Sequence, residues 1–410
     1  MTDLESVGST APGGNVPFRA LGDLGVFIRG NGLQKSDLTE SGFPAIHYGQ
    51  LHTHYGVWAS TTKSFTTPEF AARLRRARPG DLLIATTSED DASVGKATAW
   101  LGDTEVAVSG DAYIYRHELD PRFVAYFFQS EQFRSQKSPY LSGTKVRRIS
   151  GDSLAKIKMP VPSIARQVEV VRTLDMLRDL EAELKAKLEA ELQARRTQYV
   201  QYRKQLLPSK VVAGVTASTL GGVSVSVTSG GTPPTGNAEY YGGDIPWLRT
   251  QEVNFGLIRS TSVTITEAGL RNSSAKWIPK NCVIVAMYGA TAAKVAVNDI
   301  PLTTNQACCN LQIDPSIADF RYVFHWVSNE YERLRALGEG SQSNINAQKV
   351  KDYPILLPPL SKQAEIVETL DKFDTLIDDL STGLTAELAA RRKQYEYYRD
   401  KLLTFEEAPA

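Results

Sequence analysis

Polar and basic side chains gather in four short segments of the sequence. Arginine and lysine suit the edge of guanine, and asparagine and glutamine suit the edge of adenine, so these segments have the chemistry to read nucleic-acid bases. Solvated turns have a similar composition and are the alternative. The four segments are His47, Tyr48, Gln50 and His52, which alternate along a predicted strand edge; Lys145, Arg147 and Arg148 in a basic loop; Arg249 and Gln251 after a predicted strand; and Gln342, Asn344 and Asn346 in a polar loop.

A second constellation of arginines and tyrosines occurs twice. Residues 194–203 read ARRTQYVQYR and residues 390–399 read ARRKQYEYYR. Because tyrosine and arginine are typical interface anchors, we expect each copy to dock a partner subunit. A cap that stays within the chain is the alternative. The residues are Arg195, Arg196, Tyr199 and Tyr202 in the first copy and Arg391, Arg392, Tyr395 and Tyr398 in the second.

Catalytic motifs are missing from the sequence. DNA methyltransferases need a glycine-rich cofactor loop after a strand and a polar-Pro-Pro-aromatic motif that grips a flipped base, and the chain has neither. Residues 93–97 lack the first glycine and the final Ser/Thr of a phosphate-binding loop. His52 and His54 are predicted on one side of a strand, without an acidic or thiol partner at ligand spacing. We therefore expect no catalytic residue, metal site or cofactor in the chain itself.

Charge and cysteine content narrow the class of protein. Lysine plus arginine (46) equals aspartate plus glutamate (46), so any nucleic-acid binding must come from local patches. Cys282, Cys308 and Cys309 cannot build a disulfide framework or a four-ligand zinc site, and we expect Cys308 and Cys309 to be buried as small apolar residues. With no apolar run of membrane-spanning length, the expected location is the cytoplasm.

The chain contains an internal repeat. Residues 192–207 read LQARRTQYVQYRKQLL, and residues 388–403 read LAARRKQYEYYRDKLL. Extended backwards without a gap, this alignment pairs residues 160–207 with residues 356–403, and nearly half of the paired positions are identical. Chance does not produce such agreement, so the chain holds two copies of one unit.

Each copy carries an apolar stripe with the period of a helix. Both segments lack internal proline and run about 44 residues, which predicts helices of ~66 Å. A narrow stripe on a long charged helix needs a partner, so we expect an antiparallel coiled coil with pseudo-twofold symmetry. Two independent helices are the alternative. The stripes are Val171, Leu174, Leu177, Leu180, Leu184, Leu188 and Leu192, and Val367, Leu370, Phe373, Leu376, Leu380, Leu384 and Leu388.

Each helix follows a globular segment that mixes short β-rich runs with helical runs. The two segments look unrelated apart from weak landmarks, such as the glycine-rich turns at residues 30–32 and 230–232. We predict an α+β protein with two mixed α/β domains separated by two long helices. The expected segments are the first domain (1–163), the first long helix (164–207), a linker with the second domain (208–361), and the second long helix with a tail (362–410).

This order of parts resembles the specificity subunits of Type I restriction-modification systems. The likeness covers nearly the whole chain and is carried by GDIPWLRTQEV (243–253), VIVAMYGATAAKVAV (283–297), TTNQACCNL (303–311) and PGDLLIATTSEDDASVGKA (79–97). Both helix entries, MPVPSIARQVEVVRTLD and LLPPLSKQAEIVETLD, also match the family's pattern.

The resemblance implies a non-catalytic subunit with two target-recognition domains that read a bipartite DNA site around an unread spacer. It implies assembly with two methyltransferase subunits and with restriction subunits, so that S-adenosylmethionine, ATP and magnesium belong to those partners. The four polar segments are then the predicted DNA contacts. A self-contained DNA methyltransferase and a coiled-coil adaptor without DNA specificity are the alternatives.

Overall fold

The structure, a computed structural model, describes residues 15–339 and 344–409. It divides into two compact units. The first runs to Lys187 and resumes at Thr385, and the second comprises Leu188–Leu384. Each unit therefore contains one globular domain together with part of each long helix. Within the described residues, no helix is both long and apolar enough to cross a membrane.

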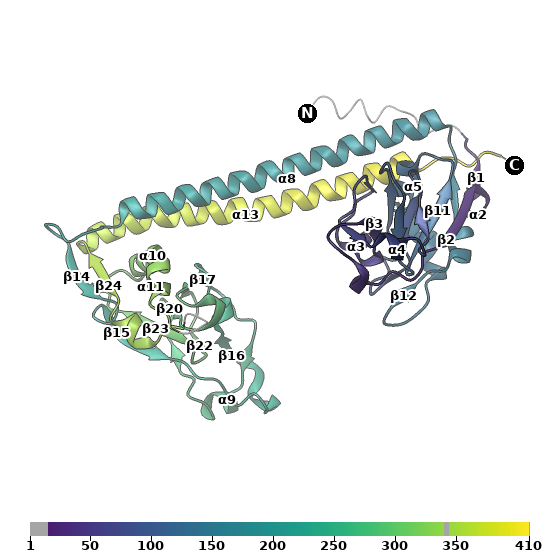
Figure 1. Ribbon diagram of the computed structural model, residues 1–410. Helices are drawn as coiled ribbons and strands as arrows, with labels where there is room; N and C mark the ends of the chain where they lie inside the picture. Colours follow the sequence, from purple (N-terminus) through teal and green to yellow (C-terminus); the bar gives the residue numbers. More distant parts are fainter. Residues whose placement is uncertain (1–14, 340–343, 410) are drawn as a thin grey trace. The chain divides into compact units, whose positions relative to one another are not determined.

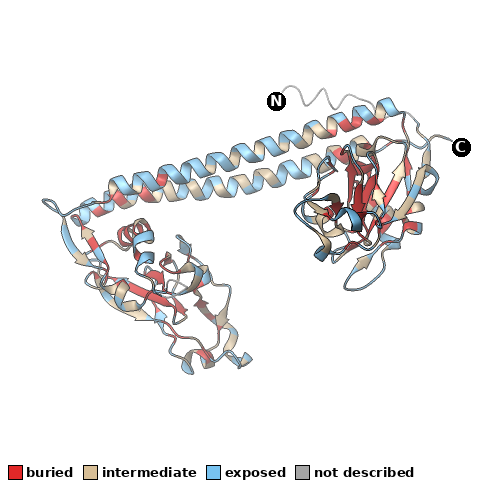
Figure 2. Cartoon of the chain, in the orientation of Figure 1, coloured by how far each residue is buried: buried red, intermediate tan, exposed pale blue. Residues whose placement is uncertain are grey.

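The two long helices are α8 (Ile164–Leu206) and α13 (Leu360–Leu403), with 43 and 44 residues. In the first unit the start of α8 is grouped with the end of α13, and in the second unit the end of α8 is grouped with the start of α13. The helices are thus antiparallel within each unit, as predicted. Both are exposed along much of their length (Figure 2), and α13 begins directly after Pro359.

Both globular domains contain the same two sheets in the same strand order, which their sequences do not reveal. In the first domain the five-stranded sheet is β2 (Gly25–Arg29), β11 (Ala112–His117), β7 (Leu82–Ala85), β9 (Ala97–Trp100) and β4 (Trp58–Ala59), and the four-stranded sheet is β5 (Ser64–Thr66), β3 (Phe43–Ile46), β10 (Val106–Val108) and β6 (Arg76–Ala77). In the second domain the corresponding sheets are β15 (Ser224–Ser229), β23 (Cys308–Ile313), β20 (Val283–Ala286), β21 (Val295–Asn298) and β17 (Leu257–Ile258), and β18 (Thr264–Ile265), β16 (Tyr241–Leu248), β22 (Leu302–Thr304) and β19 (Trp277–Ile278). Figure 1 labels β2, β3 and β11 in the first domain and β15, β16 and β23 in the second. The predicted α+β class is confirmed.

The central strand of each five-stranded sheet is buried on both faces. In β7, Leu82 and Ile84 pack on the side of helix α5 (Pro121–Phe127), and Leu83 packs on the side of the four-stranded sheet. This two-sided burial explains why β7 and β20 are continuous apolar runs rather than alternating ones.

The cysteines of the second domain also lie in this core. Cys308 and Cys309 lie on opposite faces of β23, and Cys282 is buried beside β20. Burial raises the pKa of the Cys309 and Cys282 thiols to about 12. The expectation that Cys308 and Cys309 act as small apolar residues is confirmed.

A short antiparallel strand pair closes each domain where its long helix begins. β1 (Phe18–Ala20) pairs with β13 (Lys158–Pro160), and β14 (Thr216–Thr219) pairs with β24 (Pro354–Leu357). These pairs return the chain to the start of the helix, which then packs on its own domain.

In the first unit, α8 is joined to α5 by buried polar groups. Gln167 is fully buried, and its side-chain oxygen accepts a hydrogen bond from the backbone N–H of Asp120 at 2.9 Å. About two turns further along α8, the Asp175 carboxylate accepts hydrogen bonds from the Tyr126 hydroxyl at 2.6 Å and from the Arg122 guanidinium at 3.0 Å. The helix is therefore fixed to the domain at two points.

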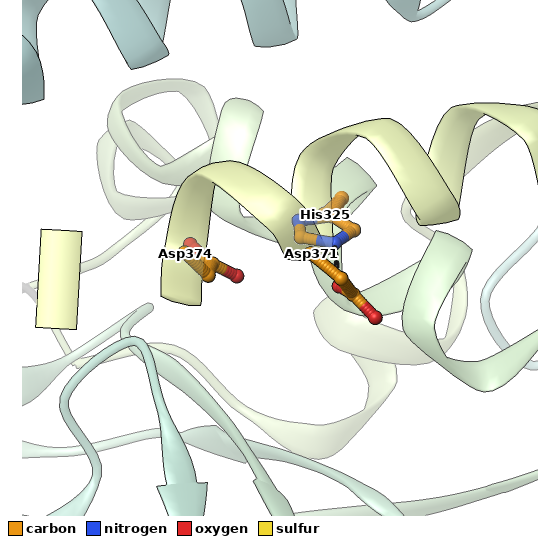
Figure 3. A group of neighbouring side chains, drawn as sticks. All are labelled: His325, Asp371 and Asp374. Carbon is orange, nitrogen blue, oxygen red and sulfur yellow. Dashed lines mark hydrogen bonds and ion pairs between the residues drawn. The ribbon is translucent and has the colours of Figure 1, made fainter. Parts of the chain in front are cut away.

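The second unit repeats this joint with one change of side chain. Gln363 accepts from the backbone N–H of Asp319 at 2.9 Å, and Asp371 pairs with Arg321 at 2.6 Å. Figure 3 shows His325 beside Asp371 in this joint. Where the first unit has Tyr126, helix α10 (Phe320–Asn329) has His325, whose Nε2 lies 2.7 Å from the Asp371 carboxylate. The joint therefore contains a buried histidine whose pKa is lowered by burial.

His325 should make the second unit less stable in mild acid. Burial lowers its pKa, outweighing its bond to Asp371, so the ring stays neutral in the fold while the unfolded chain takes up a proton below pH ~6.5. We expect the contribution of His325 to the unfolding free energy to be complete above that pH and to be lost as the pH drops towards the folded pKa. The total loss is about 1.4 kcal/mol for each unit by which folding lowers the pKa. Urea unfolding followed by tryptophan fluorescence at several pH values measures this slope.

His325→Gln is the matched variant, because glutamine does not titrate. The other four histidines lie in the first domain, so the second unit's transition should lose its pH dependence between about pH 6.5 and 5. Asp371, Asp374, Arg321 and Tyr199 also face the ring. The pKa of Asp371 is lowered, so this group contributes at lower pH, whereas burial raises the pKa of Asp374, and any pH dependence that the variant keeps is assigned to Asp374. An unchanged slope in the variant would show that His325 is not the responsible group.

Candidate nucleic-acid interface

The segment from His47 to His52 is helical, and the predicted strand edge is wrong. Strand β3 ends at Ile46, and helix α3 (Tyr48–Thr53) follows at once. His47 caps this helix, since its Nδ1 accepts from the Gly49 N–H at 3.2 Å, while Gln50 accepts from the His47 N–H at 3.0 Å. The alternation of polar residues looked like a strand, but this reciprocal cap starts a helical turn.

The four predicted residues of α3 have different roles. Gln50 anchors the turn, because its amide also donates to the Ser64 hydroxyl at 2.7 Å. His52 Nε2 lies 2.9 Å from the Thr87 carbonyl, and burial lowers the pKa of this histidine. His47 and Tyr48 instead line an open concavity. DNA contact by all four stays a prediction, and the geometry favours His47 and Tyr48.

The concavity beside α3 has a volume of ≈ 520 Å³. This lies within the roughly 300–1,000 Å³ that is usual for ligand sites. Arg29 closes one side, where its guanidinium lies 3.8 Å from the Asp111 carboxylate. Burial lowers the pKa of His47, so its imidazole is neutral at pH 7. The polar residues that line the concavity include Arg29, Gln34, Lys35, His47, Tyr48 and Asp111.

Sequence reasoning missed Arg29, Gln34, Lys35 and Asp111. The signal that could have found the first three was the glycine-rich turn at residues 30–32, which those residues flank. In the sequence alone, that turn is only a landmark shared by the two domains.

The basic loop of the first domain is a hairpin that lies next to α3. Its strand β12 (Arg147–Arg148) pairs with β8 (Thr87–Ser88), and Thr87 also contacts His52. Arg147 is held by the Asp91 carboxylate and the Gly143 carbonyl. Lys145 and Arg148 are exposed. The two predicted segments of the first domain therefore meet at one edge.

In the second domain, Arg249 occupies the place of His47. It precedes the short 3₁₀ helix η4 (Thr250–Glu252), and its N–H donates to the Glu252 carboxylate at 3.4 Å. The guanidinium donates to the Ser262 hydroxyl at 3.3 Å, and Gln251 is exposed. Both predicted residues thus lie at the surface of this turn.

The polar loop of the second domain occupies the position of the basic hairpin, as predicted. Ile149 N–H donates to the Thr86 carbonyl, and Ile345 N–H donates to the Met287 carbonyl, so the two loops rejoin equivalent places. Asn344 accepts from the Gly289 N–H at 3.2 Å.

The other two predicted residues of this loop differ from Asn344. Asn346 caps helix α12 (Ala347–Lys351) by accepting from the Lys349 N–H at 2.9 Å, which gives it a structural role. Gln342 lies outside the described residues.

The repeated tyrosines differ between the two units. Tyr199 is a core residue of the second unit, with its hydroxyl 3.3 Å from His325 Nδ1, so a role as an accessible partner anchor is wrong for this residue. Tyr202 stacks on Phe373 with ring centroids 5.0 Å apart. Tyr199 is buried within the chain rather than by a partner, because α10 packs beside its ring.

In the first unit the equivalent place is an open groove of ≈ 350 Å³. The position of Phe373 in the repeat is held by Leu177, which is smaller and leaves the groove unfilled. Arg391 pairs with Glu387 at 2.8 Å on one rim. The groove is lined by Leu177, Leu180, Leu184, Arg391, Tyr395 and Tyr398.

The remaining predicted arginines are solvent-exposed. Arg195 lies 3.7 Å from Glu191, and Arg392 lies 3.5 Å from Glu396, each one helical turn away. Arg196 is also exposed. Exposed pairs of this kind contribute about 0.3–0.5 kcal/mol each, so they leave the arginines available to a partner.

His325, Asp371 and Asp374 form the group of described residues that most resembles a set of metal ligands, since their ligand atoms lie within 4.8 Å of one another (Figure 3). The guanidinium of Arg321 lies 2.6 Å from Asp371 and 3.2 Å from Asp374. One fixed cation already pairs with both carboxylates, so the group is an ion-pair joint between α10 and α13.

Tyr199→Ala should destabilise the second unit far more than Tyr202→Ala. Removing a buried aromatic ring costs about 3–5 kcal/mol, whereas losing one half-exposed stacking contact costs about 1 kcal/mol. Urea unfolding of the two variants, monitored by tryptophan fluorescence, compares these costs. Equal destabilisation would contradict the different burial of the two rings.

The comparisons with known proteins agree with this arrangement. The family described as "Type I restriction modification DNA specificity domain" matches twice, over residues 14–194 and 214–390. The Escherichia coli "Type I restriction enzyme EcoR124I/EcoR124II specificity subunit" is 37% identical over 281 residues, covering 65% of this chain and 68% of that protein. A putative specificity subunit of Haemophilus influenzae is 28% identical over 303 residues, covering 71% of this chain and 74% of that protein.

Solved structures share the fold at low sequence identity. A chain described in work on complex assembly and conformational transition of the type I R-M system aligns with a TM-score of 0.74 and 14% identity, covering 96% of this chain and 98% of its own. The HsdS subunit from Thermoanaerobacter tengcongensis aligns with a TM-score of 0.56 and 14% identity, covering 97% and 99%. With two family matches that together span most of its length, the chain belongs to the Type I restriction-modification DNA specificity family.

Proposed function

We propose that this chain is the non-catalytic DNA-reading and assembly subunit of a Type I restriction-modification complex. The proposal rests on one observation: the two domains share one backbone fold but carry different polar side chains on their loops. Both domains have the same strand order, yet His47 and Tyr48 in one stand where Arg249 and Thr250 stand in the other. Two equal scaffolds with unequal polar loops suit two different half-sites of one bipartite target, separated by a spacer that is not read.

The partner proposal rests on the long helices. Two methyltransferase subunits would dock on the helix pair, and restriction subunits would join the assembled complex. The groove lined by Leu180, Leu184 and Tyr398 combines an apolar floor with the charged rim of Arg391, which is the composition of a protein interface. S-adenosylmethionine, ATP and magnesium would be bound by those partners. Neither the self-contained methyltransferase nor the adaptor without DNA specificity gains support from the family match.

Exchange of the first domain tests the reading function. Replacing residues 17–163 with the first domain of another family member should change one half of the methylated sequence and leave the other half intact, because each domain has its own frame and loops. Sequencing of methylated adenines in a host that carries the system gives the result. A simultaneous change in both halves would contradict independent reading, and methyl transfer by the isolated chain would contradict the non-catalytic assignment.

A charge placed in the groove tests the docking function. Leu180→Glu should reduce the number of bound methyltransferase subunits from two towards one, since Leu180 is 52% exposed and the substitution leaves the core untouched. The equivalent residue of the second copy, Leu376, is 56% exposed, but Phe373 and Tyr202 fill the place of the groove there, so Leu376→Glu should weaken docking less than Leu180→Glu does.

Native mass spectrometry counts the subunits in each complex. Val211→Glu is the matched control, because Val211 is 60% exposed and lies between α8 and the second domain. A complex of Leu180→Glu that keeps both methyltransferase subunits would overturn this site.

A further inference from the structure

Three loops of the first domain meet at one end of its two sheets, around the concavity beside α3. We name them loop 1 (residues 30–35), loop 2 (47–50) and loop 3 (109–111). Loop 1 is hydrogen-bonded to the end of β10, since Asn31 N–H donates to the Val108 carbonyl at 3.3 Å. Loop 3 is bonded to the end of β3, since Ser109 N–H donates to the Ile46 carbonyl at 3.2 Å.

The second domain builds the same three loops from a different sequence. They are loop 1 (230–235), loop 2 (249–252) and loop 3 (305–307). Gly231 N–H donates to the Thr304 carbonyl at 2.9 Å, and Asn305 N–H donates to the Leu248 carbonyl at 2.9 Å. These bonds are the counterparts of those in the first domain, so the backbone frame of the three loops is shared.

Loop 1 approaches the strand end that precedes loop 3 so closely that only glycine fits at its first position. A Cβ atom on Gly30 would lie 2.7 Å from the Val108 carbonyl oxygen, and a Cβ atom on Gly230 would lie 1.9 Å from the carbonyl oxygen of Thr304, the counterpart of Val108. Both distances are far below any van der Waals contact. The shared glycine is therefore a requirement of the frame and explains the landmark that the two sequences retain.

The side chains displayed by this frame differ between the domains. In the first domain, Gln34 and Lys35 project from loop 1, and both are exposed. In the second domain, exposed Gln306 projects from loop 3 and is bonded to the Thr232 hydroxyl of loop 1. An amide can pair with the edge of adenine and an ammonium with guanine, so the two sets offer different base preferences.

Loop 2 links these residues to the hairpins at the same edge of each domain. In the first domain, α3 carries His47 and Tyr48 at one end, and its His52 contacts Thr87 of the hairpin's partner strand. In the second domain, Lys294 donates to Asn254, just after η4, at 2.8 Å, and Gly289 bonds Asn344. Each domain thus has a polar edge that runs from loop 1 to the hairpin in the first domain and to Asn344 in the second.

We infer that Gln34 and Lys35 in the first domain, and Gln306 in the second, determine base specificity within their half-sites. This inference rests on the proposed DNA-reading function and adds residues to it. Loops that were merely solvated would not need the same backbone hydrogen bonds in both domains, nor a glycine at the same close contact. The frame holds the loops in place, and the exposed side chains are the part that is free to differ.

Selection of bound sequences from a randomised duplex DNA pool tests the inference, using the full chain assembled with its methyltransferase subunits. The variants are Gln34→Ala with Lys35→Ala, and separately Gln306→Ala. We expect the first variant to lose roughly tenfold to hundredfold discrimination at one or more positions of the first half-site, with the second half-site unchanged. Gln306→Ala should show the reciprocal pattern.

Two controls separate base reading from other effects. Lys156→Ala removes an exposed lysine next to α7 (Gly151–Ala155), on a segment outside the three loops, and should leave both half-sites as they are. Lys35→Arg keeps a positive charge with N–H donors that can reach guanine O6 and N7, and should retain the preference for guanine. Thermal unfolding of each variant shows that the domain is intact.

The outcomes distinguish the two levels of the argument. A wild-type complex that selects no sequence would overturn the proposed function. A selective wild-type complex whose Gln34→Ala/Lys35→Ala and Gln306→Ala variants keep full selectivity at every position would overturn only this inference. Equal weakening on all sequences would assign the residues to phosphate contact and would also reject them as specificity determinants.

Discussion

The structure depends on how each long helix is bound to the domain that precedes it. A fully buried glutamine and, two turns later, an aspartate paired with an arginine fix α8 and α13 in the same way. Both ion pairs are partly buried, and breaking either one would leave a charged group without its partner, so helix and domain are coupled in orientation. The identities that the repeat retains at Gln167/Gln363 and Asp175/Asp371 therefore reflect a mechanical requirement as much as common descent.

Two-sided burial separates the constant from the variable part of each domain. β7 and β20 contact α-helices on one face and the second sheet on the other, so almost any polar change there would bury an unpaired group. The loops at the strand ends have no such restriction. A domain of this kind can change what it recognises without changing its core, and this explains how two segments with little visible sequence similarity share one strand order.

The sequence predicted the parts of the fold that have strong periodicity. The helix-period stripe and the repeat were sufficient for α8, α13 and their antiparallel pairing, although the first residues of each stripe, such as Leu174 and Leu370, pack in the cores of the domains. Helix α3 was mispredicted, since Tyr48-Gly49-Gln50-Leu51 alternates like a strand and its cap uses a histidine rather than the usual Ser, Thr, Asp or Asn. Tyr199 was misassigned because its neighbour His325 is more than a hundred residues away in sequence. Gln34 and Lys35 gave no periodic signal, and only the folded loops bring them to His47.

The buried thiols of the second domain have a practical consequence for labelling chemistry. Cys282, Cys308 and Cys309 are the chain's three cysteines, and all are enclosed in the sheet core with thiols that resist ionisation. Maleimides react with thiolates at the surface, so a cysteine introduced at an exposed site would react far faster than the native ones. Two such positions, one in each compact unit, would accept a donor and an acceptor fluorophore without removal of any native cysteine. Energy transfer between them would then report in solution how the distance between the units changes when DNA is bound.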